Sequence, residues 1–207
     1  AEALKDREFK IYWANLEVLK PSIYSRPPVP VVTSRFKDRR ELPRRASEIL
    51  ERALVSDFEA DDLHDTLVHV RDDLAINARG VPWVRLGERD GEPAAICEHL
   101  DRKDFRHEPA RKWSEVGWAA KRAWLTREQM QKRFGDAAVQ PGINYEKHKV
   151  ADEYHGEKKA EVWEIWSKTD NTVVWVTEGA ENVLDKRDPW LSLKGFFPCP
   201  RPAYDTL

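Results

Sequence analysis

The sequence predicts an α+β fold in which N-terminal helices precede a mainly antiparallel β region. Apolar residues recur at helical spacing in the first part of the chain, and short apolar segments separated by turn residues follow from residue 80 onward. This change of pattern divides the chain into a helical part, 1–79, and a mainly β part, 80–207. At 207 residues, the chain can bury one large core or two small ones.

Helices are expected over 3–19, 42–55 and 63–78. The first should stop before Pro21, because proline disfavours helical geometry in the residue that precedes it. Pro43 is tolerated in the first turn of the second helix, and Gly80 is expected to cap the third. Between the first two helices, four prolines within 21–34 predict a stiff, extended segment that could lie across a surface or span two subunits.

Two hairpins are expected in the β part. The first pairs residues 81–86 with 94–100 around Asp90-Gly91, a favoured turn pair. The second pairs 161–167 with 172–177, and three aromatic residues should pack across it as core or interface side chains: Trp163, Trp166 and Trp175. In apolar strands beside Val and Ile, these tryptophans indicate packing rather than a platform that stacks on bases.

A strand over 117–125 should separate the two hairpins and lead into a short helix. Thr126 and Gln129 have the spacing of a capping box at the start of this helix, which should end near Gly135. Residues 136–159 are polar and show no periodicity, so they predict a surface loop.

Charge and composition exclude several classes. The chain has 35 basic and 37 acidic residues, whereas a dedicated nucleic-acid binder usually has a basic excess. No apolar run approaches the roughly 20 residues of a membrane span, and the charged N-terminal residues do not form a signal peptide. Cys97 and Cys199 lack the spacing of a zinc site or a disulfide framework and are interpreted as buried thiols in a reducing compartment.

One acidic cluster could hold a divalent cation: Asp57, Asp61, Asp62, His64 and Asp65. A metal-dependent nuclease is therefore one alternative function. The favoured interpretation is that these acids complement the positive N-terminus of the next helix. A second group lacks the paired spacing of metal ligands: His99, Asp101, Asp104 and His107. With no phosphate loop, nucleophile elbow or Cys–His pair in view, we assign no catalytic, metal or cofactor residues and expect no enzyme.

A basic segment is the strongest candidate contact surface: Arg35, Lys37, Arg39, Arg40, Arg44 and Arg45. Clustered cations can contact phosphates or an acidic neighbour. The overall charge favours a partner subunit over DNA, and a nucleic-acid-binding module is the second alternative function. The simpler interpretation is a solvated helix start whose cations pair with the acidic residues at 57–62.

Four stretches of the chain, in this order, resemble the N-terminal part of portal proteins of tailed phages and prophages, distantly similar to podovirus portals. They are IYWANLEVLKPSIYSRPP at 11–28, NARGVPWVR at 77–85, DFRHEPARKWSEVGW at 104–118, and AEVWEIWS at 160–167 with GFFPCPRP at 195–202. None of these stretches is a catalytic motif.

The resemblance implies a structural role in the wing region of a portal. Portal proteins form a ring, dodecameric in the virion, at one capsid vertex. Double-stranded DNA passes through the ring during packaging and ejection. The implied partners are further copies of the chain, the capsid protein, the terminase large subunit, tail adaptor proteins and this DNA. The implied location is the virion, after assembly in the host cytoplasm. Because stem, clip and crown segments are missing, we expect the chain to be part of a longer protein.

Overall fold

The computed structural model describes residues 2–33, 40–145, 158–191 and 193–201, with side chains from residue 11 onward. The prediction of an α+β fold with N-terminal helices followed by a β region is confirmed. The chain forms two compact units, residues 1–99 and 100–201. The change from helix to strand comes at residue 80, as expected, but the units divide after His99, so the first hairpin belongs to the helical unit.

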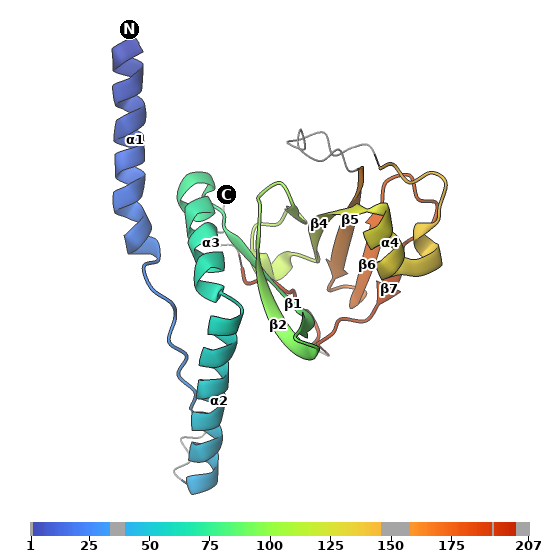
Figure 1. The fold of residues 1–207 in the computed structure, drawn as a ribbon, viewed down its shortest axis with the longest axis horizontal. Coiled ribbons are helices and arrows are strands. Elements are labelled where there is room, and N and C mark those ends of the chain that lie inside the picture. The colour runs from blue at the N-terminus through green and yellow to red at the C-terminus, as the bar shows by residue number, and fades with distance from the viewer. Residues whose placement is uncertain (1, 34–39, 146–157, 192, 202–207) are drawn as a thin grey trace. The chain divides into compact units, whose positions relative to one another are not determined.

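In its described residues, the first unit contains three helices and a hairpin (Figure 1): α1 Glu2–Ile23, α2 Glu41–Ala60, α3 Leu63–Asn77, β1 Val81–Arg89 and β2 Glu92–Leu100. Asp90 and Gly91 join the two strands with φ angles of 54° and 83°. Two consecutive positive φ angles define a type I′ turn, as the Asp-Gly pair predicts. Pro43 lies in the first turn of α2, which confirms the predicted start of that helix.

Two of the predicted helix ends are wrong. Helix α1 does not stop before Pro21 but continues to Ile23. The backbone hydrogen bond that follows has helical spacing, because the Tyr24 N–H donates to the Lys20 carbonyl oxygen at 3.0 Å. Ala78, with φ 57°, rather than Gly80 is the left-handed residue after α3. Gly80 is needed for another reason: a Cβ there would lie 2.1 Å from the Val70 carbonyl oxygen, so only glycine lets the chain pass so close to α3.

Helix α1 contacts α3 through a narrow part of its surface. Leu16 and Lys20 are the buried α1 side chains among those described. The Lys20 ammonium donates to Glu17 at 2.8 Å and lies 3.6 Å from Asp72 on α3. The hydrogen bond to Glu17 raises the pKa of Lys20. Since few α1 side chains are buried, most of the described helix surface stays exposed.

The second unit is built on a five-stranded antiparallel sheet in chain order: β3 Phe105–His107, β4 Trp118–Thr126, β5 Lys159–Ser167, β6 Thr172–Thr177 and β7 Asp185–Arg187. The predicted hairpin at 161–177 is present as β5 and β6. Between β4 and β5 lies the short helix α4, Arg127–Phe134. The predicted capping box is also confirmed: Gln129 N–H donates to the Thr126 hydroxyl at 3.2 Å, and Thr126 N–H donates to the Gln129 side chain at 2.9 Å.

The prediction of a surface loop over 136–159 is wrong for its first part. Ala138, Ile143 and Tyr145 are buried and pack with Met130 of α4 and Val162 of β5 in the core of the second unit. Because the backbone is irregular there, these apolar residues have no period that reveals their burial. Residues 146–157 lie outside the described part of the chain.

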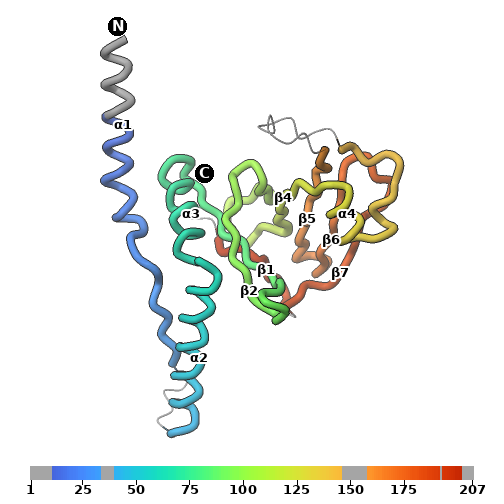
Figure 2. The backbone as a smooth tube through the Cα atoms, in the orientation of Figure 1, coloured from blue at the N-terminus to red at the C-terminus, as the bar shows by residue number. Residues whose placement is uncertain are grey.

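The C-terminal segment belongs to this unit. Phe197, Pro198 and Cys199 are buried. The Phe197 ring meets Trp113 edge-on at 5.6 Å between ring centroids, and the Lys168 ammonium lies 4.0 Å from the Phe197 centroid. In Figure 2 this segment is the red end of the described trace, after β7.

Candidate functional site

The three tryptophans of the second hairpin do not form one ladder. Strand register places Trp166 and Trp175 on the same face of the sheet and Trp163 on the other. Trp166 is buried, and Trp175 packs against the core around Met130. They serve as core side chains on that face, while Trp163 lies on the opposite face.

A carboxylate binds the indoles on each face. Glu164 accepts from Nε1 of Trp166 at 2.8 Å and from Nε1 of Trp175 at 3.2 Å. On the other face, Glu161 accepts from Trp163 Nε1 at 2.8 Å. Sequence reasoning missed both carboxylates. The signal was available, because Glu-x-Trp occurs twice in β5 and side chains two residues apart share a face of a strand.

Arg122 completes the pattern on the Trp163 face. It donates to Asp104 at 2.7 Å and to Glu161 at 3.5 Å, and its guanidinium lies 5.6 Å from the centre of the Trp163 ring. These contacts pair Arg122 with Asp104 and Glu161 inside the second unit. They are therefore structural, and the pair His107 and Asp104 forms no metal site: His107 Nδ1 hydrogen-bonds the Glu108 carbonyl oxygen at 2.7 Å instead.

Asp61 connects the helices of the first unit to its hairpin. Its carboxylate accepts from the Cys97 N–H at 2.6 Å and from the Arg89 guanidinium at 2.8 Å, and the side chain is only 12% exposed. Both carboxylate oxygens are therefore used by strands β1 and β2. Asp62 is the N-cap residue of α3 and Asp65 lies in its first turn, so acidic residues stand at this helix N-terminus as expected, although the Asp62 side chain makes no capping hydrogen bond.

The remaining members of the acidic cluster are dispersed. His64 Nδ1 lies 3.1 Å from the Tyr24 hydroxyl, and Asp65 lies 3.6 Å from His69 of the next turn. His99, from the second candidate group, pairs with Asp73 of α3 at 2.7 Å. Within the described ranges, no three His, Cys, Asp or Glu side chains are grouped to hold a metal ion.

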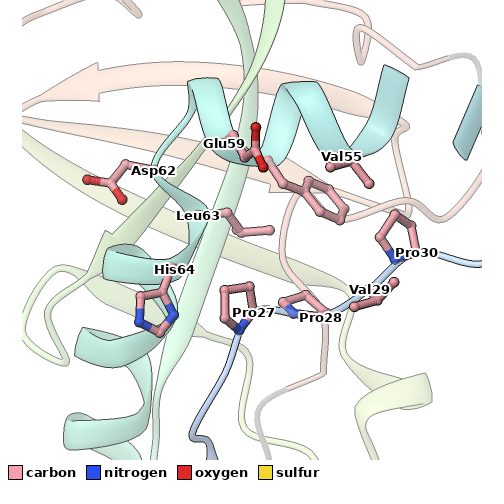
Figure 3. Close-up of a pocket in the computed structure, with 10 residues that line it drawn as sticks. Pro27, Pro28, Val29, Pro30, Val55, Glu59, Asp62, Leu63 and His64 are labelled. Carbon is pink, nitrogen blue, oxygen red and sulfur yellow. The ribbon is translucent and has the colours of Figure 1, made fainter. Parts of the chain in front are cut away.

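A cavity of about 450 Å³ lies between the proline-rich segment and helices α2 and α3 (Figure 3). Its walls are mostly apolar: Pro27, Pro28, Val29, Pro30, Val55, Phe58 and Leu63, with Glu59, Asp62 and His64 also lining it. The segment is held on both sides of the cavity, by the Tyr24–His64 contact and by the Val32 N–H, which donates to Glu51 at 3.2 Å. The expectation that this segment lies across a surface thus holds for its described residues.

The basic segment is described only in part. Arg35, Lys37 and Arg39 lie outside the described residues. Arg40 precedes α2, and Arg44 and Arg45 lie in its first turns. Arg44 is 3.3 Å from Glu48, and Arg45 pairs with Glu41, all on the exposed surface of the same helix.

The expected pairing of these arginines with the acids at 57–62 is therefore wrong for Arg44 and Arg45. Both groups lie on one helix, the basic group at its start and the acidic group at its end. At 1.5 Å per residue, Arg44 and Asp57 are about 20 Å apart along the helix axis. The structure thus leaves two opposite charge groups separated within the same chain.

Exposed apolar side chains are concentrated on α1 and α2. On α1 they are Ile11, Tyr12, Trp13, Val18, Leu19 and Ile23, and on α2 Leu42, Ile49, Leu50, Leu54 and Val55. Helix α2 has no buried residue. Exposed apolar side chains gathered on one helix mark candidate interaction sites, so the helical unit offers two candidate contact faces.

Both thiols are protonated at neutral pH. Burial raises the pKa of Cys97 to about 11 and that of Cys199 to about 12, and the nearby carboxylates of Asp61 and Glu98 act on Cys97 in the same direction. A nucleophilic cysteine needs the opposite shift. Cys199 is buried as expected, whereas Cys97 is only partly buried.

No protein-family model matches the chain, and no curated protein matches it significantly. None of the helices in the described residues has both the length and the apolar character needed to cross a membrane.

Proposed function

We propose that the chain is a structural module of a phage portal ring, in which contacts between copies build the DNA channel at one capsid vertex. The proposal is supported by the coincidence of two features in residues 11–28. This stretch resembles portal proteins in sequence, and it contains the exposed apolar face of α1. A helix face that the described residues of its own unit leave uncovered is what a subunit contact requires.

The position of this face on α1 supports a contact with another chain. Ile11 and Val18, seven residues apart, lie on the same side of the helix and are 61% and 77% exposed. Leu16 and Lys20 are buried against α3 on the other side. A contact that joins this face to a different surface of the next copy is heterologous, and such contacts generate rings when the rotation closes.

In this role the chain acts by positioning rather than by chemistry. Further copies, capsid protein, terminase large subunit and tail adaptor proteins are the proposed protein partners, and double-stranded DNA is the proposed cargo of the channel. The near balance of 35 basic and 37 acidic residues fits a channel wall that DNA passes without being held tightly.

The proposal is tested by the particle mass of the chain carrying Ile11→Gln and Val18→Gln. Both positions are exposed, and glutamine has at least the helix propensity of the residues it replaces, so α1 should still form. The wild type should form a particle of many subunits and the variant should lose it. Val139→Gln, at a similarly exposed position in the second unit, is the matched control and should keep the wild-type mass. A variant that keeps the wild-type mass would remove α1 from the contact.

A further inference from the structure

The charges of α2 are arranged against the dipole of the helix. A helix is stabilised by acidic groups near its N-terminus and basic groups near its C-terminus. Helix α2 has Arg40, Arg44 and Arg45 at its start, and its last turns contain Asp57 and Glu59 without any basic residue. Glu41 is the acidic residue of the first turn. The arrangement therefore costs the isolated helix stability.

An apolar stripe connects the two charged ends. Leu42, Ala46, Ile49 and Ala53 follow the 4-3-4 spacing of one helix side, and Leu50 and Leu54 widen it. Leu42 is 80% exposed and Ile49 66% exposed. The proline-rich segment lies elsewhere on the helix, where Val55 and Phe58 line the cavity and Glu51 accepts from Val32. Among the described residues, the stripe is therefore exposed from Leu42 to Leu54.

We propose that α2 pairs antiparallel with α2 of a second copy of this chain. Only the antiparallel orientation brings the basic start of each helix against the acidic end of the other. In this register the two apolar stripes overlap at the centre of the pair, where Leu50 of one copy lies level with Leu54 of the other. The charge pattern that is unfavourable within one helix is then favourable in the pair, because basic residues of one copy meet acidic residues of the other at each end. The occupant of the stripe is thus a second copy, because the complementary charges are present on the same helix.

Arg45 and Glu59 identify the contact at residue level. They are fourteen residues apart, which is two heptads, so both lie along the same edge of the apolar stripe. About 21 Å separates them along one helix. In an antiparallel pair centred near Arg52, each Arg45 lies against Glu59 of the other copy. Arg52 then faces its own counterpart at the two-fold axis, with Glu48 one turn away on each helix to offset the two positive charges.

This pairing goes beyond the proposed ring. A two-fold contact uses the same patch on both copies and closes at two, whereas ring contacts are heterologous. It therefore doubles whatever unit it joins, a single chain or a complete ring. Loss of the α2 contact should halve the particle mass, whereas loss of the α1 contact should remove the ring. The two results are distinguishable on one column.

Charge reversal tests the pairing with the full chain, by light scattering during size-exclusion chromatography over a concentration series. Arg45→Glu and Glu59→Arg should each halve the mass and raise the Kd of pairing about tenfold or more, because like charges then meet at both ends. The double variant R45E/E59R should restore the wild-type mass.

An equal mixture of the two single variants should also pair. At one end of the mixed pair, the glutamate introduced at position 45 of one copy meets the arginine introduced at position 59 of the other. At the other end, the native Glu59 meets the native Arg45. Both ends are then complementary, although neither variant pairs well with itself.

Arg44→Glu is the matched control. Arg44 neighbours Arg45, is similarly exposed (73% against 69%) and also has an ion pair within the helix, but it lies on a different side of α2. R44E should therefore keep the wild-type mass. R44E and R45E each lose an i,i+4 ion pair and place two glutamates one turn apart, so the control matches this local cost. An acid near the helix start and a base near its end otherwise improve the interaction with the dipole.

Any one of the following results would overturn the proposal: a wild-type mass of a single chain or a single odd-numbered ring at every concentration, an R45E mass equal to wild type, or single variants that do not pair when mixed. Equal effects of R44E and R45E would show a general response to charge, and would also overturn it.

Discussion

Replacing Asp61 by alanine should weaken the attachment of the β1–β2 hairpin to the helices of the first unit. The substitution removes the acceptor of the Cys97 N–H at 2.6 Å and of the Arg89 guanidinium at 2.8 Å. A hydrogen bond to a charged group contributes about 1.5–3 kcal/mol. Arg89 is 28% exposed and regains water when its partner is lost, so its share falls toward that of a surface pair, below about 1 kcal/mol. The expected loss of unfolding free energy is therefore about 1.5–4 kcal/mol.

Hydrogen exchange measures this loss locally. The Cys97 amide should exchange faster in Asp61→Ala than in the wild type, by the factor that corresponds to the lost free energy. Asp61→Asn keeps one acceptor oxygen and should lose about half as much. Asp62→Asn is the control, because the Asp62 side chain makes no capping hydrogen bond and asparagine tolerates its left-handed backbone, φ 49°. Unchanged protection of Cys97 in Asp61→Ala would refute the structural role of this carboxylate.

The same position separates the nuclease alternative from a purely structural role of Asp61. We expect no Mg²⁺-dependent DNA cleavage by the wild type. If cleavage were found and Asp61→Asn removed it without changing the protection of Cys97, Asp61 would be a metal ligand rather than the anchor of the hairpin.

Three further predictions concern stability and thiol reactivity. Thr126→Ala removes the capping box of α4 and should lower the stability of the second unit by about 1 kcal/mol in urea unfolding, whereas Thr126→Ser should not. Gly80→Ala forces a Cβ against the Val70 carbonyl and should lower the free energy of unfolding by about 1–3 kcal/mol. Ala78→Gly relieves a positive φ and should raise the free energy of unfolding by about 0.5–1 kcal/mol. Equal effects of the two substitutions would contradict the end of α3 at Ala78. Cys97 and Cys199, with pKa values of about 11 and 12, should react slowly with a thiol reagent at pH 8 and quickly after unfolding. Both folded pKa values are above the value of about 8.5 for a thiol in the unfolded chain. The two thiols therefore contribute fully to stability below about pH 8.5, and this contribution declines as the pH rises toward 11 and 12. Urea midpoints that stay equal from about pH 8 to about pH 10.5 would contradict this expectation.

Local signals predicted the elements that depend on neighbouring residues. Asp90-Gly91 determines its turn through the backbone of two residues, and Thr126 with Gln129 defines the start of α4 through contacts three residues apart. The alternation of Glu and Trp in β5 also contains its contacts, because residues two apart share a face. Applying the two-residue spacing of a strand to polar as well as apolar residues would have identified Glu161 and Glu164 as partners of the tryptophans.

Long-range contacts were not predictable in the same way. Asp61 bonds to Arg89 and Cys97, which are 28 and 36 residues further along the chain, so its sequence neighbourhood suggested a helix cap or a metal ligand instead. Ala138, Ile143 and Tyr145 are buried from an irregular backbone that has no period. The separation of basic and acidic groups on α2 became visible only when the helix proved continuous from Glu41 to Ala60.

The particle mass of the wild-type chain is the most direct test of self-assembly. Light scattering on a size-exclusion column over a concentration series should give a particle of many subunits, reduced to half by Arg45→Glu and dissociated by the α1 substitutions Ile11→Gln and Val18→Gln. A mass equal to one chain at every concentration would contradict both the ring and the pairing of α2.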